Sequence, residues 1–268
     1  MRHTLYIIIA AALLSACSQI EPEDRLTAVP FLPEDLIQRN VLIEDFTGQN
    51  CPNCPTATDV IEGLEEGYEG HVVGVSIHSG NLGRGMALWT PYGDTRFDKL
   101  GKDLPQPTVR VDRTNAIYTG GNEVQNGLHS GGKTQLQKSS PITIGSYSCT
   151  QTGEEGKSLT YSVRVASTKD INAMVQVWII EDGITSRQKM PDGTTNKDYV
   201  HKSAFRATMT ADEGEPMQIG AGMSQEFGLT YDASKFKGNM DNCHAVVIVS
   251  LPNDGEVLQV AKFPLVSK

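Results

Sequence analysis

The chain has 268 residues, of which 32 are Asp or Glu and 23 are Lys or Arg, so its formal net charge is −9. An excess of acidic side chains repels a phosphate backbone, which excludes nucleic acid as a partner. The same excess argues against attachment to anionic lipid through a basic patch. Because one domain usually has ~100 to 200 residues, we expect two domains.

The first sixteen residues have the three parts of a signal peptide. A short basic start precedes an apolar run of ten residues, Leu5 to Leu14, and two small residues then precede Cys17. The run is half of the ~20 residues that a transmembrane helix needs, so we predict that it directs export and is removed. Leu14-Ser15-Ala16-Cys17 resembles a bacterial lipobox, which implies a covalent lipid on Cys17. A plain secretory peptide with an incidental cysteine is the alternative.

A polar segment rich in proline follows, from residue 17 to about 39, and predicts a flexible tether. Its acidic residues Glu21, Glu23 and Asp24 resemble the surface-display signal of Bacteroidota lipoproteins. That resemblance implies lipid anchorage in the outer membrane, with the cell surface favoured over the periplasmic face. The same charges are equally expected in any solvated linker.

Residues 40–140 alternate between strand and helix patterns. Val60, Ile61 and Leu64 share one face of a predicted helix, and the runs on either side of it are β-branched. A stretch with five glycines, 119–140, suits a closing helix or a linker. The predicted order is a strand at 41–46, a helix at 56–68, a strand at 71–78, a helix near 94–100, and strands at 107–112 and 116–118.

From Pro141 to the end, short alternating apolar runs are separated by Gly, Asn and Asp turns. Half a dozen strands without helices predict a β-sandwich. The runs are 142–147, 159–166, 174–180, 204–209, 245–251 and 256–263.

Cys51 and Cys54 are two residues apart, between a predicted strand and a predicted helix. The unpaired N–H groups at a helix N-terminus favour the thiolate, which is the nucleophile in thiol–disulfide exchange. We therefore assign attack to Cys51 and resolution of the mixed disulfide to Cys54. One alternative is a permanent structural disulfide. Half of a zinc site is another, but the sequence contains no second CxxC or CxxH, and no metal is predicted.

Two further features resemble the thioredoxin superfamily. Asp45-Phe46 precedes Cys51 by six residues, and Pro107 begins a predicted strand. The resemblance implies that a buried Asp45 deprotonates Cys54, with Glu44 as the competing carboxylate. It also implies a cis peptide bond at Pro107 beside the substrate chain.

Two positions limit what the thioredoxin resemblance carries over. Pro105 is the alternative to Pro107 as the cis-proline, and Asn50 stands where that family often has a tryptophan. The fold class implied is an α/β thioredoxin-like domain over 40–140, with a mixed sheet flanked by helices, followed by an all-β sandwich over 141–268.

Taken whole, the sequence resembles the 28-kDa outer-membrane lipoproteins of Bacteroidota. The resemblance rests on the lipobox, the acidic tether, the segment from Glu44 to Pro55 and the β-rich second half, together with a motif from Asp198 to Arg206. Its His201 suits a turn or packing position better than a catalytic role. No cofactor is implied beyond the lipid on Cys17.

Cys149 and Cys243 both fall in or beside predicted strands of the second half. Export permits a disulfide, so we predict that they pair with each other, with two buried free thiols as the alternative.

Two functions remain open from the sequence. The first is a membrane-tethered thiol–disulfide oxidoreductase that acts on exported thiol proteins or with a redox partner protein. The second is a surface binding protein or adhesin, whose sandwich loops contact a host or matrix ligand. Segments 119–133 and 182–202 are the predicted contact regions for that second function.

Overall fold

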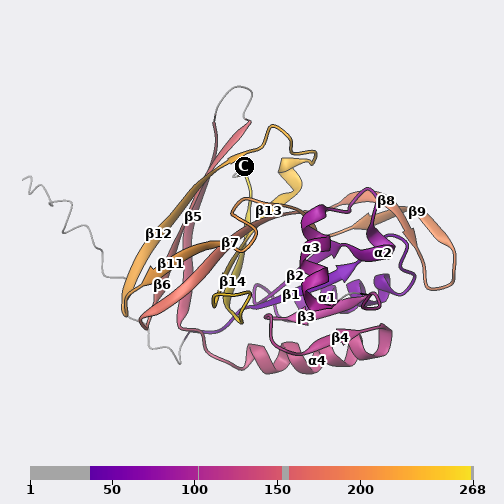
Figure 1. Ribbon diagram of the computed structural model, residues 1–268, viewed down its shortest axis with the longest axis horizontal. Helices are drawn as coiled ribbons and strands as arrows, with labels where there is room; N and C mark the ends of the chain where they lie inside the picture. The colour runs from indigo at the N-terminus through magenta and orange to yellow at the C-terminus, as the bar shows by residue number, and fades with distance from the viewer. Residues whose placement is uncertain (1–36, 102, 153–156, 267–268) are drawn as a thin grey trace, which may run out of the picture.

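The computed structural model describes residues 37–101, 103–152 and 157–266. Within this part of the chain there are fourteen strands and four α-helices. The strands form a nine-stranded mixed sheet, a three-stranded sheet and a separate two-stranded hairpin (Figure 1). The predicted signal peptide, Cys17 and most of the predicted tether lie outside the described residues. No helix in the described part is long and apolar enough to cross a membrane.

The first elements form a strand–helix–strand unit in which the two strands are parallel. The helix begins after Asn53 with a proline in its first turn, as is common at helix starts. Ala57, Ile61 and Leu64 lie on one face of it and are buried against the sheet. Burying a side chain such as leucine contributes about 1.5 to 3 kcal/mol. These elements are β1 (Val41–Thr47), α1 (Cys54–Gly67) and β2 (Val72–His78).

The next elements complete the helical part of the molecule. The Thr90 side chain accepts a hydrogen bond from the Gly93 N–H at 3.0 Å and caps the second long helix. The glycine-rich stretch forms the last helix, which packs closely on β4. A Cβ at Gly127 would lie 2.1 Å from the Tyr118 ring, so this position requires glycine. These elements are α2 (Gly80–Gly83), α3 (Pro91–Leu100), β3 (Thr108–Val111), β4 (Ile117–Thr119) and α4 (Gly121–Leu136).

The remaining strands include the six that the apolar runs predict and four more. The three-stranded sheet has the order β12-β6-β5, and the hairpin pairs β8 with β9. The strands are β5 (Ile142–Thr152), β6 (Ser158–Ser167), β7 (Ile171–Glu181), β8 (Ile184–Lys189), β9 (Thr195–His201), β10 (Ala204–Thr208), β11 (Glu215–Ile219), β12 (Met223–Asp232), β13 (Cys243–Ser250) and β14 (Val257–Pro264).

The nine-stranded sheet runs through both halves of the chain in the order β14-β13-β7-β10-β2-β1-β3-β4, with β11 paired to β7. Its two parts join where Ala204 of β10 pairs with Ser76 of β2. One face packs against α3 through a core that contains Phe46, Phe97 and Trp178. The opposite face packs against α1 and α4 at one end and against the three-stranded sheet at the other.

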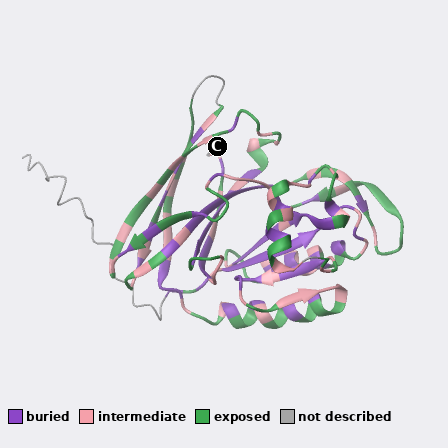
Figure 2. Cartoon of the chain, in the orientation of Figure 1, coloured by how far each residue is buried: buried purple, intermediate pink, exposed green. Residues whose placement is uncertain are grey.

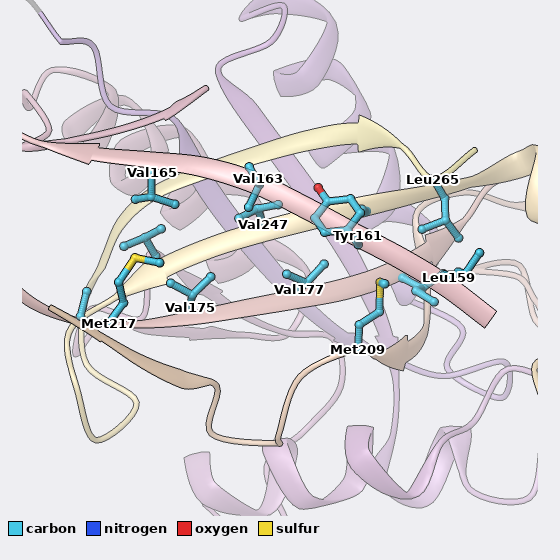
Figure 3. Packing of buried hydrophobic residues seen from close by; sticks show 14 of the residues in the cluster. Leu159, Tyr161, Val163, Val165, Val175, Val177, Met209, Met217, Val247 and Leu265 are labelled. Atoms are coloured by element: carbon cyan, nitrogen blue, oxygen red, sulfur yellow. The ribbon is translucent and has the colours of Figure 1, made fainter. Parts of the chain in front are cut away.

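The layer between the two sheets is an apolar core built from alternating residues of facing strands (Figure 3). Leu159, Tyr161 and Val163 of β6 meet Val175 and Val177 of β7, and all five are fully buried. Burial extends along the central strands of the nine-stranded sheet, whereas the outer surfaces of the helices are exposed (Figure 2).

The predicted fold class was wrong. The described chain is mostly β, with few helices and one large mixed sheet, and it is not a helix-flanked thioredoxin-like fold followed by an all-β sandwich. The physical reason is that the edge of β2 is not free. Ser76 of β2 pairs with Ala204 of β10, and the Ser76 N–H donates to the Ser203 carbonyl at 2.9 Å. Strands of the second half continue the sheet beyond β10.

Candidate functional site

Cys51 and Cys54 form the predicted disulfide, with a Cα–Cα distance of 5.4 Å. Cys54 is the first residue of α1, so the disulfide places the Cys51 sulfur beside the start of that helix. The loop from β1 is tight. The Cys51 N–H donates to the Gly48 carbonyl at 2.9 Å, and a Cβ at Gly48 would lie 2.4 Å from the backbone of Leu82. Both cysteines are buried, at 0% and 1% exposure.

Asp45 and Glu44 are adjacent in β1 and face opposite sides of the sheet, because side chains alternate along a strand. Glu44 is paired. Its Oε1 lies 2.6 Å from Nη2 of Arg96 and 3.3 Å from Nε of Arg113. Asp45 shares its parity with Ile43, which packs in the core beneath α1. Asp45 therefore faces the side of the sheet that carries the helix of Cys54.

The carboxyl group of Asp45 has no hydrogen-bond partner on either oxygen and is fully buried. Burial raises the pKa of Asp45 from 3.8 to about 8, because removal from water disfavours the charged form. The competing carboxylate at Glu44 is held in ion pairs. Of the two, Asp45 is thus the carboxyl group without a partner.

The peptide bond between Gln106 and Pro107 is cis. β3 runs antiparallel to β1 with Thr108 opposite Phe46, which puts Pro107 beside the end of β1 that leads to Cys51. The Gln106 side-chain amide donates to the carbonyls of Thr47 at 2.8 Å and Ser79 at 2.9 Å. These bonds fix the loops after β1 and β2 to the start of β3.

The hairpin β8–β9 lies against the loop that carries Cys51, at the end of the molecule beside α2 (Figure 1). The Gln188 side-chain amide donates to the carbonyl of Cys51 at 2.9 Å, and the Lys189 N–H donates to the carbonyl of Gln49 at 2.9 Å. The hairpin belongs to the second half of the chain. Residues 137 positions apart are therefore in direct contact at the disulfide.

Two histidines lie beside Cys54. His78 ends β2 and His201 ends β9, and their ring centroids are 5.3 Å apart. Both line a cavity of about 10 Å³ together with Cys54, Thr58 and Tyr199. Burial, helped by the charges of His201 and Arg206, lowers the pKa of His78 to about 3. Burial also lowers the pKa of His201, so burial disfavours the protonated form of both rings.

Of the four predicted site residues, Cys51 and Cys54 form one disulfide, Asp45 lies in β1 on the sheet face that carries α1, and Pro107 precedes β3 beside the end of β1. The sequence reasoning missed Gln188 and the pair His78 and His201. The motif from Asp198 to Arg206 was the available signal for β9, but nothing in it indicated contact with the disulfide loop. No group of three or more His, Cys, Asp or Glu among the described residues is arranged to hold a metal ion.

The predicted disulfide between Cys149 and Cys243 is wrong, because both cysteines are free. Cys149 lies in β5 of the three-stranded sheet, opposite Tyr161, whereas Cys243 begins β13 in the large sheet. The Cys243 thiol instead donates to the Asn239 carbonyl at 3.2 Å. Cys243 also lines a separate cavity of about 670 Å³. Burial, followed by the charge of Glu181, raises the pKa of Cys243 to about 12.

A family model described as outer membrane protein Omp28 matches residues 98–267. The matched segment contains Pro107 and the hairpin, and it leaves Cys51 and Cys54 outside. Among solved structures, HBP35 of Porphyromonas gingivalis is similar over 85% of this chain and 76% of its own, with a TM-score of 0.64 and 18% identity.

A second solved structure, from Agrobacterium tumefaciens, is similar over 85% of this chain and 95% of its own, with a TM-score of 0.51 and 14% identity. A domain of the outer membrane lipoprotein Omp28 from Porphyromonas gingivalis covers 46% of this chain and 94% of its own, at 17% identity and a TM-score of 0.30. The first two similarities concern the fold alone. None of the curated proteins compared matches this chain.

Proposed function

We propose a function for this chain from one premise: it belongs to the Omp28 family of outer membrane proteins. Membership confirms the resemblance to the 28-kDa outer-membrane lipoproteins of Bacteroidota that the sequence carries. The chain is an outer membrane protein. In that setting, we propose that Cys51 and Cys54 carry out thiol–disulfide exchange on exported proteins.

The observation that carries this proposal is the disulfide at the start of α1, on the sheet face where Asp45 is buried without a partner. A structural disulfide needs no titratable group nearby, and an unpartnered buried carboxyl group is costly to keep. A carboxyl group with a pKa of about 8 both takes up and releases a proton near neutral pH. Perturbed groups of this kind are concentrated at functional sites.

The exchange reaction follows from these positions. In the reduced protein, the Cys51 thiolate attacks one sulfur of a client disulfide, and the other client sulfur leaves as a thiolate. The Cys54 thiol gives its proton to the Asp45 carboxylate and attacks the Cys51 sulfur. The bond between Cys51 and the client breaks, the second client thiolate leaves, and the Cys51–Cys54 disulfide forms. The client gains two electrons, and the reverse sequence oxidises a client dithiol.

The direct test is the variant Cys54→Ala, which keeps the attacking thiol and removes the resolving one. We expect it to accumulate mixed disulfides with exported proteins, visible on non-reducing gels, and the matched variant Cys51→Ala to accumulate none. Wild-type protein supplied with a reductant should reduce insulin disulfides. Absence of trapped clients together with absence of insulin reduction contradicts the proposal.

We also propose that Cys17 carries the lipid anchor, because the lipobox resemblance and the family point the same way. Two acyl chains are enough for stable anchoring. Labelling of growing cells with a radioactive fatty acid should mark the wild-type chain and fail to mark Cys17→Ser.

Protease treatment of intact cells, compared with lysed cells, tests the proposed cell-surface location. A reductant at that location needs a partner protein that supplies its electrons.

The burial of both sulfurs favours a second candidate function, a surface binding protein in which the disulfide is structural. Its expected ligand is a host or matrix protein held by loops of the second half. The double variant Cys51→Ser with Cys54→Ser separates the two candidates. If the chain is a binding protein, binding of cells to immobilised matrix proteins should survive this change, and the wild type should show no exchange on exported proteins. If the exchange function holds, the wild type should carry out exchange and the double variant should not.

A further inference from the structure

The hairpin β8–β9 contacts the disulfide loop through polar groups. The Gln188 side-chain amide donates to three carbonyls, those of Cys51 at 2.9 Å, Lys189 at 3.1 Å and Gly48 at 3.3 Å. In return, the Gln49 side-chain amide donates to the Arg187 carbonyl at 2.8 Å and to the Ser186 hydroxyl at 2.9 Å. The loop and the hairpin are thus held together by reciprocal amide contacts.

The hairpin is held by polar contacts, and none of its residues belongs to the three apolar cores of the described chain. β8 and β9 pair only with each other among the described strands, and most of their residues are exposed or half-buried. Only Gln188 and His201 in these two strands are buried. A two-stranded hairpin is marginally stable by itself, and segments with few buried apolar contacts open before the core does.

The covered groups are the ones that exchange must reach. Cys51 and Cys54 have 0% and 1% of their surface exposed, so a client sulfur reaches neither of them in this arrangement of the chain. Gln188 contacts the carbonyl of Cys51 itself, and Tyr199 and His201 line the cavity beside Cys54. The access that the chemistry needs therefore depends on movement of this segment.

We infer that β8–β9 is a displaceable cover over the Cys51–Cys54 disulfide, and that Gln188 is the residue that determines access to it. The inference deepens the proposed exchange function and rests on it for its purpose, although the movement itself is independent of any client. When the cover leaves, the carbonyls of Gln49 and Cys51 lose the donors that the hairpin supplies, whereas the Gly48 carbonyl keeps the Cys51 N–H. A polypeptide that enters the site supplies replacement N–H groups.

The experiment measures how fast a water-soluble phosphine reduces the disulfide. Phosphorus attacks one sulfur, the S–S bond breaks, and water converts the adduct to a phosphine oxide and two thiols, which are counted by alkylation and mass spectrometry. We expect Gln188→Ala to be reduced about 5- to 30-fold faster than wild type, because it loses hydrogen bonds that hold the closed state. The matched control Gln218→Ala, on an exposed position of β11, should be reduced at the wild-type rate.

A second measurement needs no variant. Amide hydrogen exchange in the wild-type protein should be faster at Lys189, whose N–H donates to Gln49, than at the buried amides of β7. Equal exchange at these sites, or equal phosphine reduction of Gln188→Ala and wild type, overturns the inference. Faster reduction of Gln188→Ala without any trapped client would keep the cover and contradict the exchange function.

Discussion

The core between the two sheets and the sheet region around β1 are both fully buried, but they are built from different chemistry. The inter-sheet core consists of apolar side chains such as Leu159, Val163 and Val247. Around β1, by contrast, Glu44 is buried with arginines on one face and Asp45 is buried without a partner on the other. Every carboxyl oxygen without a hydrogen-bond partner among the buried described groups lies in this region, on Glu44, Asp45 or Asp112.

This difference in side chains gives the two regions a different dependence of stability on pH. Apolar burial is favourable at any pH, because no proton is involved. Buried ionisable groups lower the stability over the pH range in which the unfolded chain would ionise and the folded chain resists it. The β1 region is thus less stable than its burial suggests, and it is the region that contains the disulfide. Four variants test this contrast.

The largest effect is expected for Glu44→Gln. The Glu44 carboxylate is the shared partner of Arg96 and Arg113. Arg96 also pairs with the partly exposed Asp254, and its guanidinium lies 5.2 Å from the centroid of the Trp178 ring. Removing one member of a buried ionic group costs about 3 to 5 kcal/mol of unfolding free energy, because the remaining charges stay desolvated. Urea denaturation at pH 7 measures the loss.

The matched control for that variant is Glu213→Gln. Glu213 pairs with Lys99 at the surface, where its side chain is 57% exposed. Exposed pairs contribute about 0 to 1 kcal/mol, so the control should unfold nearly as the wild type does. Similar losses for the two variants would show that the Glu44 cluster behaves as a surface pair.

Asp45→Asn should stabilise the protein, and more so as the pH rises. The folded pKa of about 8 lies above the ordinary 3.8, so between these values the unfolded chain has released a proton that the folded chain keeps. Wild-type stability from this group therefore falls as the pH rises from 4 to 8. At one pKa unit per 1.36 kcal/mol, the gain of the variant reaches up to about 4 kcal/mol at pH 7 and vanishes near pH 4.

Denaturation of Asp45→Asn and wild type at several pH values measures that difference, and Asp98→Asn on the exposed side of α3 is the control. A difference that does not change with pH would show that Asp45 ionises freely in the folded state. The same variant should slow resolution of trapped clients near neutral pH, if Asp45 accepts the proton of Cys54.

In the apolar core, Leu159→Ala should lose about 3 kcal/mol of unfolding free energy, within the 2 to 5 kcal/mol usual for buried leucines. The loss should be the same at pH 5 and pH 8, because no titratable group changes. Leu251→Ala, at a position that is 39% exposed, is the control and should change the stability by less than about 0.5 kcal/mol. A loss that depends on pH would break the contrast between the two regions.

Local patterns predicted most elements but not their partners. The apolar run at 41–46 and the helical face of Val60, Ile61 and Leu64 correspond to β1 and α1, because both depend on neighbours in sequence. The pairing of Ser76 with Ala204 joins residues far apart in the chain, and no local pattern specifies which strand takes a free edge. The fold class failed at that point.

The site was predicted where its residues are close in sequence. The spacing of Cys51 and Cys54 indicated their pairing, and the resemblance to the thioredoxin superfamily added Asp45 from the same short segment. Gln188 lies in a polar strand without apolar alternation, because the hairpin covers a loop and contributes little to a core. Its contact with Cys51 is made by hydrogen bonds across 137 positions, which composition and periodicity do not reveal.

The smallest effect is expected for His78→Phe, and its sign is opposite to that of Asp45. The folded pKa of His78 is about 3, below the ordinary 6.5, because the ring is buried and faces His201 and Arg206. Between these two pKa values, His78 is protonated in the unfolded chain and neutral in the folded chain. The contribution of His78 to the stability of the wild type therefore falls as the pH drops below 6.5. By pH 5 the loss is about 2 kcal/mol relative to pH 7, and His78→Phe should remove it.

Between pH 4 and 6.5 the contributions of His78 and Asp45 have opposite slopes, so each hides part of the other in the wild type. His78→Phe should unmask the fall of stability with rising pH that Asp45 causes, whereas the exposed control His129→Phe should leave the wild-type profile unchanged. If His78→Phe keeps the wild-type profile, the ring takes up a proton in the folded protein as readily as in the unfolded chain. The neutral pair His78 and His201 beside Cys54 would then be replaced by a charged one, and the cover would have to tolerate that charge.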